Sequence, residues 1–350
     1  VVGSSGPVLG PVVGGIILQG LSWRWMFLVN IPIGIVALVL ALRTVPKDAP
    51  GSDAPVARLD ITGIALIGPG VAAGVLALSQ AAERAAFATW QVLVPLAAAV
   101  LLLGGYAVHA LGARRTAPLI DLRLFTRRSF SASVTVGALV GLATFAFLFA
   151  LPLYYQQARG HGAFASALLL APLGVGSALS MPLTGRLSDR LGSRPLVLAG
   201  GVVAALSALA FTRAGADTPE ALTALAAFTL GLGLGSVGAP TIASLYRTLP
   251  SALVPQGSSV LYMLNQLGAS VGIATVALVV QTAGDGDAVR GFRAAAWTVA
   301  IALVVTLAAA TQLPGRPEPR QEAPDTSADT GTDAPDAPLS ETTPSAVATR

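Results

Sequence analysis

Residues 6–15 read GPVLGPVVGG and lie within a longer apolar stretch. Gly6, Gly10 and Gly14 recur every four residues, the spacing that places them on one face of a helix. In a bilayer, helices associate largely through close packing, so a face without side chains lets another helix approach. Pro11 removes one backbone donor and bends such a helix. The stretch therefore predicts a membrane helix whose smooth face is either a moving seam or a static contact.

The composition indicates a protein embedded in a membrane. Of the 350 residues, 54% are hydrophobic and 11% are charged, and the mean hydropathy is +0.73. A soluble domain of this composition would expose large apolar patches. Cysteine is absent, which excludes disulfides, thiolate metal sites and cysteine nucleophiles. His109 and His161 stand apart at the ends of expected helices, where a solvated or interfacial imidazole is favoured over a metal ligand.

Apolar stretches of roughly 17 to 25 residues predict membrane-spanning helices. The chain contains ten, at residues 1–21, 26–42, 61–82, 92–111, 131–155, 163–183, 196–212, 221–245, 256–281 and 294–312. Their length, and the lack of strict alternation between apolar and polar residues, exclude a β-barrel. We therefore expect an all-α membrane protein, a helical bundle with about ten transmembrane helices.

The charges of the connecting segments predict the orientation. Between the expected spans and just after the last one, 14 basic residues lie on one side and 6 on the other. Because cytoplasmic loops are enriched in Lys and Arg, the richer side is expected in the cytoplasm, together with both ends of this chain. Residues 314–350 are acidic and rich in Pro, Thr and Asp, and predict a disordered cytoplasmic tail. The excess of basic charge on the remainder is explained by topology and not by nucleic-acid binding.

Two neighbouring stretches carry a family signature. Gly6, Gly10, Pro11, Gly14 and Gly15 match each fixed position of G-x-x-x-G-P-x-x-G-G, which resembles the antiporter signature on the fifth helix of the major facilitator superfamily. Residues 23–34, WRWMFLVNIPIG, are similar to the W-R-W-x-F-x-x-N-x-P-I-G stretch of its fourteen-helix drug:proton antiporter branch. The resemblance continues through residues 118–125 and 265–274, and so covers nearly everything up to residue 313.

A second signature, residues 185–194 (GRLSDRLGSR), resembles the G-x-x-x-D-R-x-G-x-R loop of the superfamily's carboxyl-terminal half. Its fixed positions are Gly185, Asp189, Arg190, Gly192 and Arg194. Ser193 departs from the basic residue often seen in that position. We expect a cytoplasmic loop in which Asp189 pairs with the loop arginines, or caps a helix, and so latches one conformation. Arginines that only hold the topology are an equally good interpretation.

The resemblance implies a domain organisation. Counted against fourteen helices, the chain would hold the fifth to the fourteenth and lack the first four. Residues 1–43 would then be the last two helices of the amino-terminal bundle, and residues 44–112 a linker with two extra central helices. Residues 113–313 would form the complete carboxyl-terminal six-helix bundle, followed by the tail.

Polar residues within expected spans are candidates for a binding cavity, because they are costly in lipid. Asn265 and Gln266 lie well inside one span, and at least one is expected to face other helices or a cavity. Aromatic residues could line an apolar drug cavity, although such residues usually only pack: Phe145, Phe147, Phe149, Tyr154 and Tyr155. No Asp or Glu lies centrally in a span, so an acid for proton coupling is expected in the missing helices.

The sequence does not indicate an enzyme. Ser188 and Asp189 have no nearby histidine in the sequence, and we expect the two histidines to lack carboxylate partners. The sequence contains no phosphate-binding loop for ATP. We expect no cofactor and no metal. The resemblance implies a multi-pass cell-membrane secondary transporter that exports small amphiphilic molecules or drugs in exchange for protons, here in a truncated form. A non-transporting membrane remnant or scaffold, and a metabolite transporter of the same fold, remain alternatives.

Overall fold

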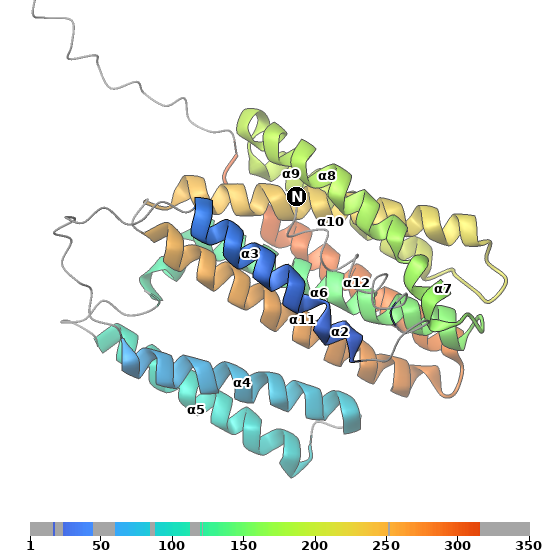
Figure 1. The fold of residues 1–350 in the computed structure, drawn as a ribbon, viewed down its shortest axis with the longest axis horizontal. Coiled ribbons are helices and arrows are strands. Elements are labelled where there is room, and N and C mark those ends of the chain that lie inside the picture. Colours follow the sequence, from blue (N-terminus) through green and yellow to red (C-terminus); the bar gives the residue numbers. More distant parts are fainter. Residues whose placement is uncertain are drawn as a thin grey trace, which may run out of the picture. The chain divides into compact units, whose positions relative to one another are not determined.

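The computed structural model describes residues 17, 24–44, 60–84, 88–112, 120, 122–250 and 253–315, and every regular element in these ranges is a helix (Figure 1). The helices are α2 (Trp25–Leu28), α3 (Asn30–Thr44), α4 (Ile61–Arg84), α5 (Trp90–Gly112), η1 (Leu122–Thr126), α6 (Arg128–Gln157), α7 (Ala163–Leu168), α8 (Ala171–Leu191), α9 (Ser193–Phe211), α10 (Glu220–Thr248), α11 (Val254–Gly284) and α12 (Ala288–Ala310).

The predicted fold class is confirmed. Within the described residues, 8 helices are long and apolar enough to cross a membrane, with α7 and α8 counted as one, and α3 is a shorter apolar helix. Each overlaps an expected span, with ends that differ by up to eight residues; the stretch expected at 131–155, for example, is the helix Arg128–Gln157, and the one expected at 163–183 extends to Leu191. The expected first span, 1–21, falls outside the described residues apart from Ile17.

Local sequence explains where several helices begin and end. The Asp287 side chain accepts hydrogen bonds from the backbone N–H groups of Val289 and Arg290 and caps the start of α12. The Asp60 carboxylate accepts the Gly63 N–H at 2.8 Å at the start of α4. Between α8 and α9 the whole connection is Gly192, whose φ of 85° is readily adopted only by glycine.

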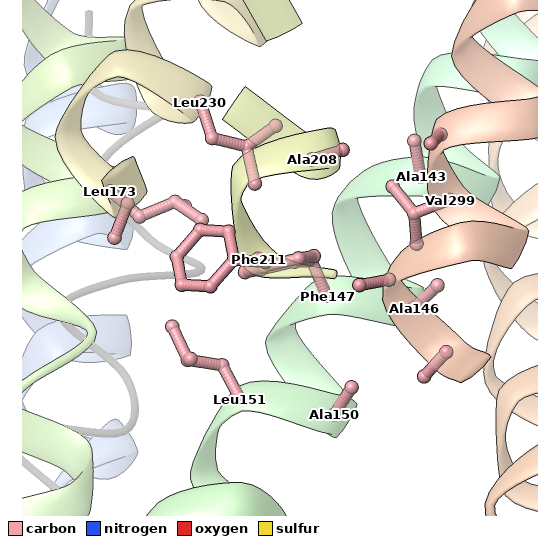
Figure 2. Close-up of a cluster of buried hydrophobic side chains, with 14 of the residues drawn as sticks. Ala143, Ala146, Phe147, Ala150, Leu151, Leu173, Ala208, Phe211, Leu230 and Val299 are labelled. Carbon is pink, nitrogen blue, oxygen red and sulfur yellow. The ribbon is translucent and has the colours of Figure 1, made fainter. Parts of the chain in front are cut away.

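The largest buried cluster lies among α6, α8, α9, α10 and α12. Phe147 of α6 and Phe211 of α9 lie with their ring centroids 4.7 Å apart, and Figure 2 shows leucines from α6, α8 and α10 around them. Alanines of α6 and α9 fill the remaining space where these helices approach α12. These aromatic rings and leucines form the packed interior that holds the neighbouring helices in place.

Several pairs of helices touch through their backbones, among them α8 with α10 and α6 with α11. A methyl group added at Gly231 of α10 would overlap the carbonyl of Leu173 in α8. In the same way, a methyl group at Gly141 of α6 would overlap the backbone carbonyl of Asn265 in α11. Since small residues are what allow such close approach in membranes, these glycines set the crossings α8–α10 and α6–α11.

The helices α3, α4 and α5 bury much less of their surface. No residue of α3 is buried. Helices α4 and α5 lie side by side as a hairpin (Figure 1), and α4 also contacts α11. Tyr106 of α5 anchors the hairpin: its hydroxyl donates to the Ile120 carbonyl at 2.8 Å and accepts the Ile120 N–H at 2.7 Å.

Candidate functional site

A cavity of about 570 Å³ lies between the α6–α11 crossing and the α8–α10 crossing. All four helices line it, and most of the lining is apolar, with residues such as Val140, Leu234 and Ile242. No charged side chain is among the residues that line it within the described ranges. A pocket of this size and character is typical of sites for drug-sized organic molecules.

Asn265 is placed in this cavity by the α6–α11 crossing. Its Nδ2 donates to the Gly137 carbonyl of α6 at 2.8 Å, and the close approach at Gly141 brings the same nitrogen against the backbone of α6. The side-chain oxygen of Asn265 has no partner among the described residues. The amide therefore joins two helices with its nitrogen and leaves its oxygen for another group.

Four further polar side chains line the cavity, and the sequence analysis did not single them out: Thr144, Ser177, Thr241 and Tyr262. Ser177 donates to the Gly231 carbonyl across the α8–α10 crossing at 3.0 Å. Thr241 donates to the Val237 carbonyl of its own helix at 2.7 Å. One signal was available, because Tyr262 precedes Asn265 by three residues and so shares its helix face.

The other residues considered for a cavity lie elsewhere. Gln266 is exposed and does not line this cavity, because the residue next to Asn265 on a helix points about 100° away. The idea that the aromatic residues of α6 line it is wrong. Phe147, Tyr154 and Tyr155 are buried in the interior cluster, and neither Phe145 nor Phe149 reaches the cavity. Tyr155 instead donates to Thr223 at 2.9 Å.

The second signature is not a loop in the structure. Gly185, Asp189 and Arg190 belong to α8, Arg194 belongs to α9, and only Gly192 separates the two helices. The apolar stretch of α8 ended before residue 185, but helical hydrogen bonding continues to Leu191 because nothing before Gly192 breaks it.

Asp189 finds its partner outside the signature. Arg247 of α10 donates to the Asp189 carboxylate at 3.1 Å and to the Ser188 carbonyl at 3.2 Å. Its other terminal nitrogen donates to the Ser188 hydroxyl at 2.9 Å and also to the Ser193 hydroxyl. The expectation that Asp189 pairs with the arginines of the signature is therefore wrong: its ion pair within the described residues is with Arg247, while Arg190 and Arg194 are exposed. Ser193, the departure from the family pattern, is one of the acceptors that hold Arg247.

The reading that the histidines lack carboxylate partners is also wrong. His109 Nε2 lies 3.0 Å from Asp60 Oδ1, and His161 Nε2 lies 3.0 Å from Glu220 Oε1. Each pair joins residues that are far apart in the sequence, so only the packing of the helices could show it. No group of three metal-ligating side chains occurs within the part of the chain that the structure describes. The seam residues Gly6, Gly10, Pro11, Gly14 and Gly15 lie outside that part.

Comparison with known proteins decides the family. The family model described as Major Facilitator Superfamily matches residues 1–273. The chain belongs to the major facilitator superfamily. It is a multi-pass membrane protein of a transporter family and not of an enzyme family, as the sequence predicted.

Relatives within the major facilitator superfamily include proteins named for drug resistance. The chain is 32% identical over 278 residues to a multidrug resistance protein B homolog of Mycobacterium tuberculosis, covering 78% of this chain and 50% of the relative. It is 30% identical over 279 residues to the lincomycin resistance protein LmrB of Listeria innocua, with 80% and 58% covered. The putative multidrug resistance protein MdtD of Serratia proteamaculans is 30% identical over 279 residues, with 79% and 57% covered. The chain thus spans between half and three fifths of the length of these relatives.

Proposed function

We propose that the protein is a secondary transporter that exports small amphiphilic molecules or drugs, and that the cavity between α6, α8, α10 and α11 is part of its binding site. The single observation that carries this proposal is the uncharged, largely apolar cavity of about 570 Å³, in a chain of this superfamily whose relatives are named for drug resistance. Such a cavity lowers the free energy of an apolar solute by removing its surface from water.

Our proposal for the domains follows the family organisation. Residues 113–313 would be the carboxyl-terminal bundle, to which α6–α12 correspond, and residues 44–112 would include the central hairpin α4–α5. Residues 1–43 would be the end of the amino-terminal bundle, with Gly10, Pro11 and Gly14 at the seam. The binding site would open to one side of the membrane and then to the other as the bundles rock.

Proton exchange is the proposed driving reaction. No carboxylate lines the described part of the cavity, so the acid that binds the proton is proposed to lie outside that lining. The excess of arginines at the end of the bundle that carries Arg186, Arg190, Arg194 and Arg247 supports a cytoplasmic location for that end in the cell membrane.

Efflux from vesicles that contain the complete gene product tests the proposal. We expect fluorescent amphiphilic dyes to be moved faster with an imposed pH gradient, and transport indifferent to the gradient would reject proton antiport. Gly238→Phe places an aromatic ring in the cavity, where only the flexible end of Met181 lies within 4 Å of an added methyl group, and should stop efflux. Gly104→Phe in α5, where nothing lies within 4 Å, is the matched control. Efflux at the unmodified protein's rate in both variants would favour a different site, and no efflux by the unmodified protein would favour a scaffold.

The orientation can be tested on the same protein. These 350 residues contain no cysteine, so once any cysteine elsewhere in the complete protein is replaced, a single introduced cysteine is labelled without background. Arg190→Cys should react with a membrane-impermeant maleimide only after the cells are opened, whereas Asp217→Cys, in the α9–α10 connection, should react in intact cells. Both positions are exposed. The opposite pattern would reverse the proposed topology.

A further inference from the structure

The polar groups of the cavity are not balanced between donors and acceptors. Three of them have already turned a donor toward a neighbouring backbone: Asn265 to Gly137 at 2.8 Å, Ser177 to Gly231 at 3.0 Å and Thr241 to Val237 at 2.7 Å. Each is positioned by a different helix. A hydroxyl that donates its only hydrogen in this way can offer a second partner nothing but its lone pairs.

Asn265 carries a second N–H hydrogen, but the position of its nitrogen still leaves the oxygen as the group that faces a ligand. Its amide nitrogen lies within the α6–α11 crossing, bonded to Gly137 and packed against Gly141, so its oxygen is the end of the amide turned away from α6. Exchanging the oxygen and nitrogen would place two carbonyl-type acceptors against each other at 2.8 Å. The amide is therefore held in one orientation.

The two other hydroxyls do not restore the balance. Thr144 and Tyr262 form no side-chain hydrogen bond among the described residues, so each can donate or accept. They adapt to either kind of ligand group and add no preference. The fixed part of the lining, made of Asn265, Ser177 and Thr241, presents acceptors.

Building on the transport function proposed above, we propose that this cavity selects uncharged apolar molecules that carry hydrogen-bond donors, such as hydroxyl or N–H groups, over analogues that can only accept. A ligand donor would satisfy an acceptor that is removed from water when the cavity fills. A ligand acceptor would meet another acceptor and lose its own hydration without replacement. A full charge would enter a lining that holds no opposite charge, which is costlier still.

Matched ligands provide the test. Binding of 1-naphthol, 1-methoxynaphthalene and naphthyltrimethylammonium is measured on the complete protein in lipid nanodiscs, with the uptake of each compound by empty nanodiscs subtracted. We expect naphthol to bind about threefold to tenfold more tightly than its methyl ether, the range given by one net hydrogen bond. The quaternary cation should bind most weakly. Equal affinities of naphthol and its ether would overturn the inference and leave the proposed cavity in place.

A variant of one acceptor sharpens the test. Thr241→Val keeps the shape of the side chain and removes the oxygen, and the helical hydrogen bond to Val237 remains because it comes from the backbone. We expect the preference for naphthol to fall about threefold, with binding of the ether unchanged. The matched control is Thr306→Val in α12, a buried threonine with the same bond to its own helix, to Ala302 at 2.8 Å, that does not line the cavity.

The outcomes separate this inference from the function on which it rests. An equal loss of both ligands in Thr241→Val would show that the threonine acts only on structure and would count against the inference. If neither naphthol nor its ether binds, and Gly238→Phe leaves efflux unchanged, the cavity is not the binding site and both proposals fail.

Discussion

The helices α6–α12 and the hairpin α4–α5 are both apolar enough to span a bilayer, yet they are held in different ways. Of an apolar stretch of 18 residues in each helix, 50% is buried in α6, whereas 22% is buried in α4 and 17% in α5. The bundle has glycine crossings, such as that of Gly231 with Leu173, and the Arg247 cluster. The hairpin contacts the bundle through α4 and α11 and through an apolar cluster, and Tyr106 adds hydrogen bonds to Ile120. Apolarity thus places a helix in the membrane, while small residues and a few polar contacts decide which helix it packs against.

The largest expected effect comes from closing a glycine crossing. Gly231→Leu would force α8 and α10 apart, because even the first carbon of the side chain overlaps the Leu173 carbonyl. We expect a loss of about 3 kcal/mol or failure to fold, seen as lost thermal stability or lost yield in detergent. Gly104→Leu in α5 faces open space and should change stability by less than about 0.5 kcal/mol. Similar stability of the two variants would remove the distinction between bundle and hairpin.

A smaller effect is expected at the Arg247 cluster. Arg247→Gln removes the hydrogen bonds to Ser188, Asp189 and Ser193 and should cost about 2 kcal/mol, because hydrogen bonds to charged groups are the stronger ones. Arg247→Lys should rescue only part of this, since one ammonium nitrogen cannot replace two guanidinium nitrogens that bond on different sides, one to Asp189 and the other to the two serine hydroxyls. Arg194→Gln is the control, because Arg194 is an exposed arginine of the neighbouring signature, residues 185–194. A greater loss of stability in Arg194→Gln than in Arg247→Gln would show that the signature arginines, and not Arg247, hold this contact between α8 and α10. The comparison is made by thermal unfolding.

The smallest of these effects is expected in the hairpin. Tyr106→Phe removes both hydrogen bonds to Ile120 and should cost about 1 kcal/mol, with faster hydrogen exchange at the end of α5. Tyr262→Phe, whose hydroxyl forms no hydrogen bond within the described residues, should leave stability unchanged. Unchanged exchange in Tyr106→Phe would mean that the hairpin is held by apolar contacts alone.

The sequence predicted the spans well because each depends on a local property, a run of apolar residues as long as the bilayer is thick. The helix Arg128–Gln157 was found from residues 131–155 alone. The resemblance at residues 6–15 and 23–34 predicted the superfamily correctly. The sequence also named Asn265, because an amide in the middle of a span is costly unless it has a partner, and Asn265 has one in Gly137.

The partners themselves could not be predicted. Arg247 lies 58 residues from Asp189, and Asp60 lies 49 residues from His109, so both pairs depend on which helices become neighbours. The aromatic residues of α6 were misplaced for a related reason. A helix that is apolar on every side gives no sign of which face meets the interior and which meets a cavity. Serine and threonine in the cavity gave no signal either, because their hydroxyls bond to nearby carbonyls wherever they lie in a membrane helix.

The one-residue connection at Gly192 has a consequence for how this protein is made. Because the helices α8 and α9 are joined by a single residue, with the charged residues of the signature at the turn, we expect them to enter the bilayer together as one hairpin during synthesis. Tags or reporter domains inserted after residue 191 should therefore arrest biogenesis. The longer connection between α9 and α10, residues 212–219, should accept the same insertions.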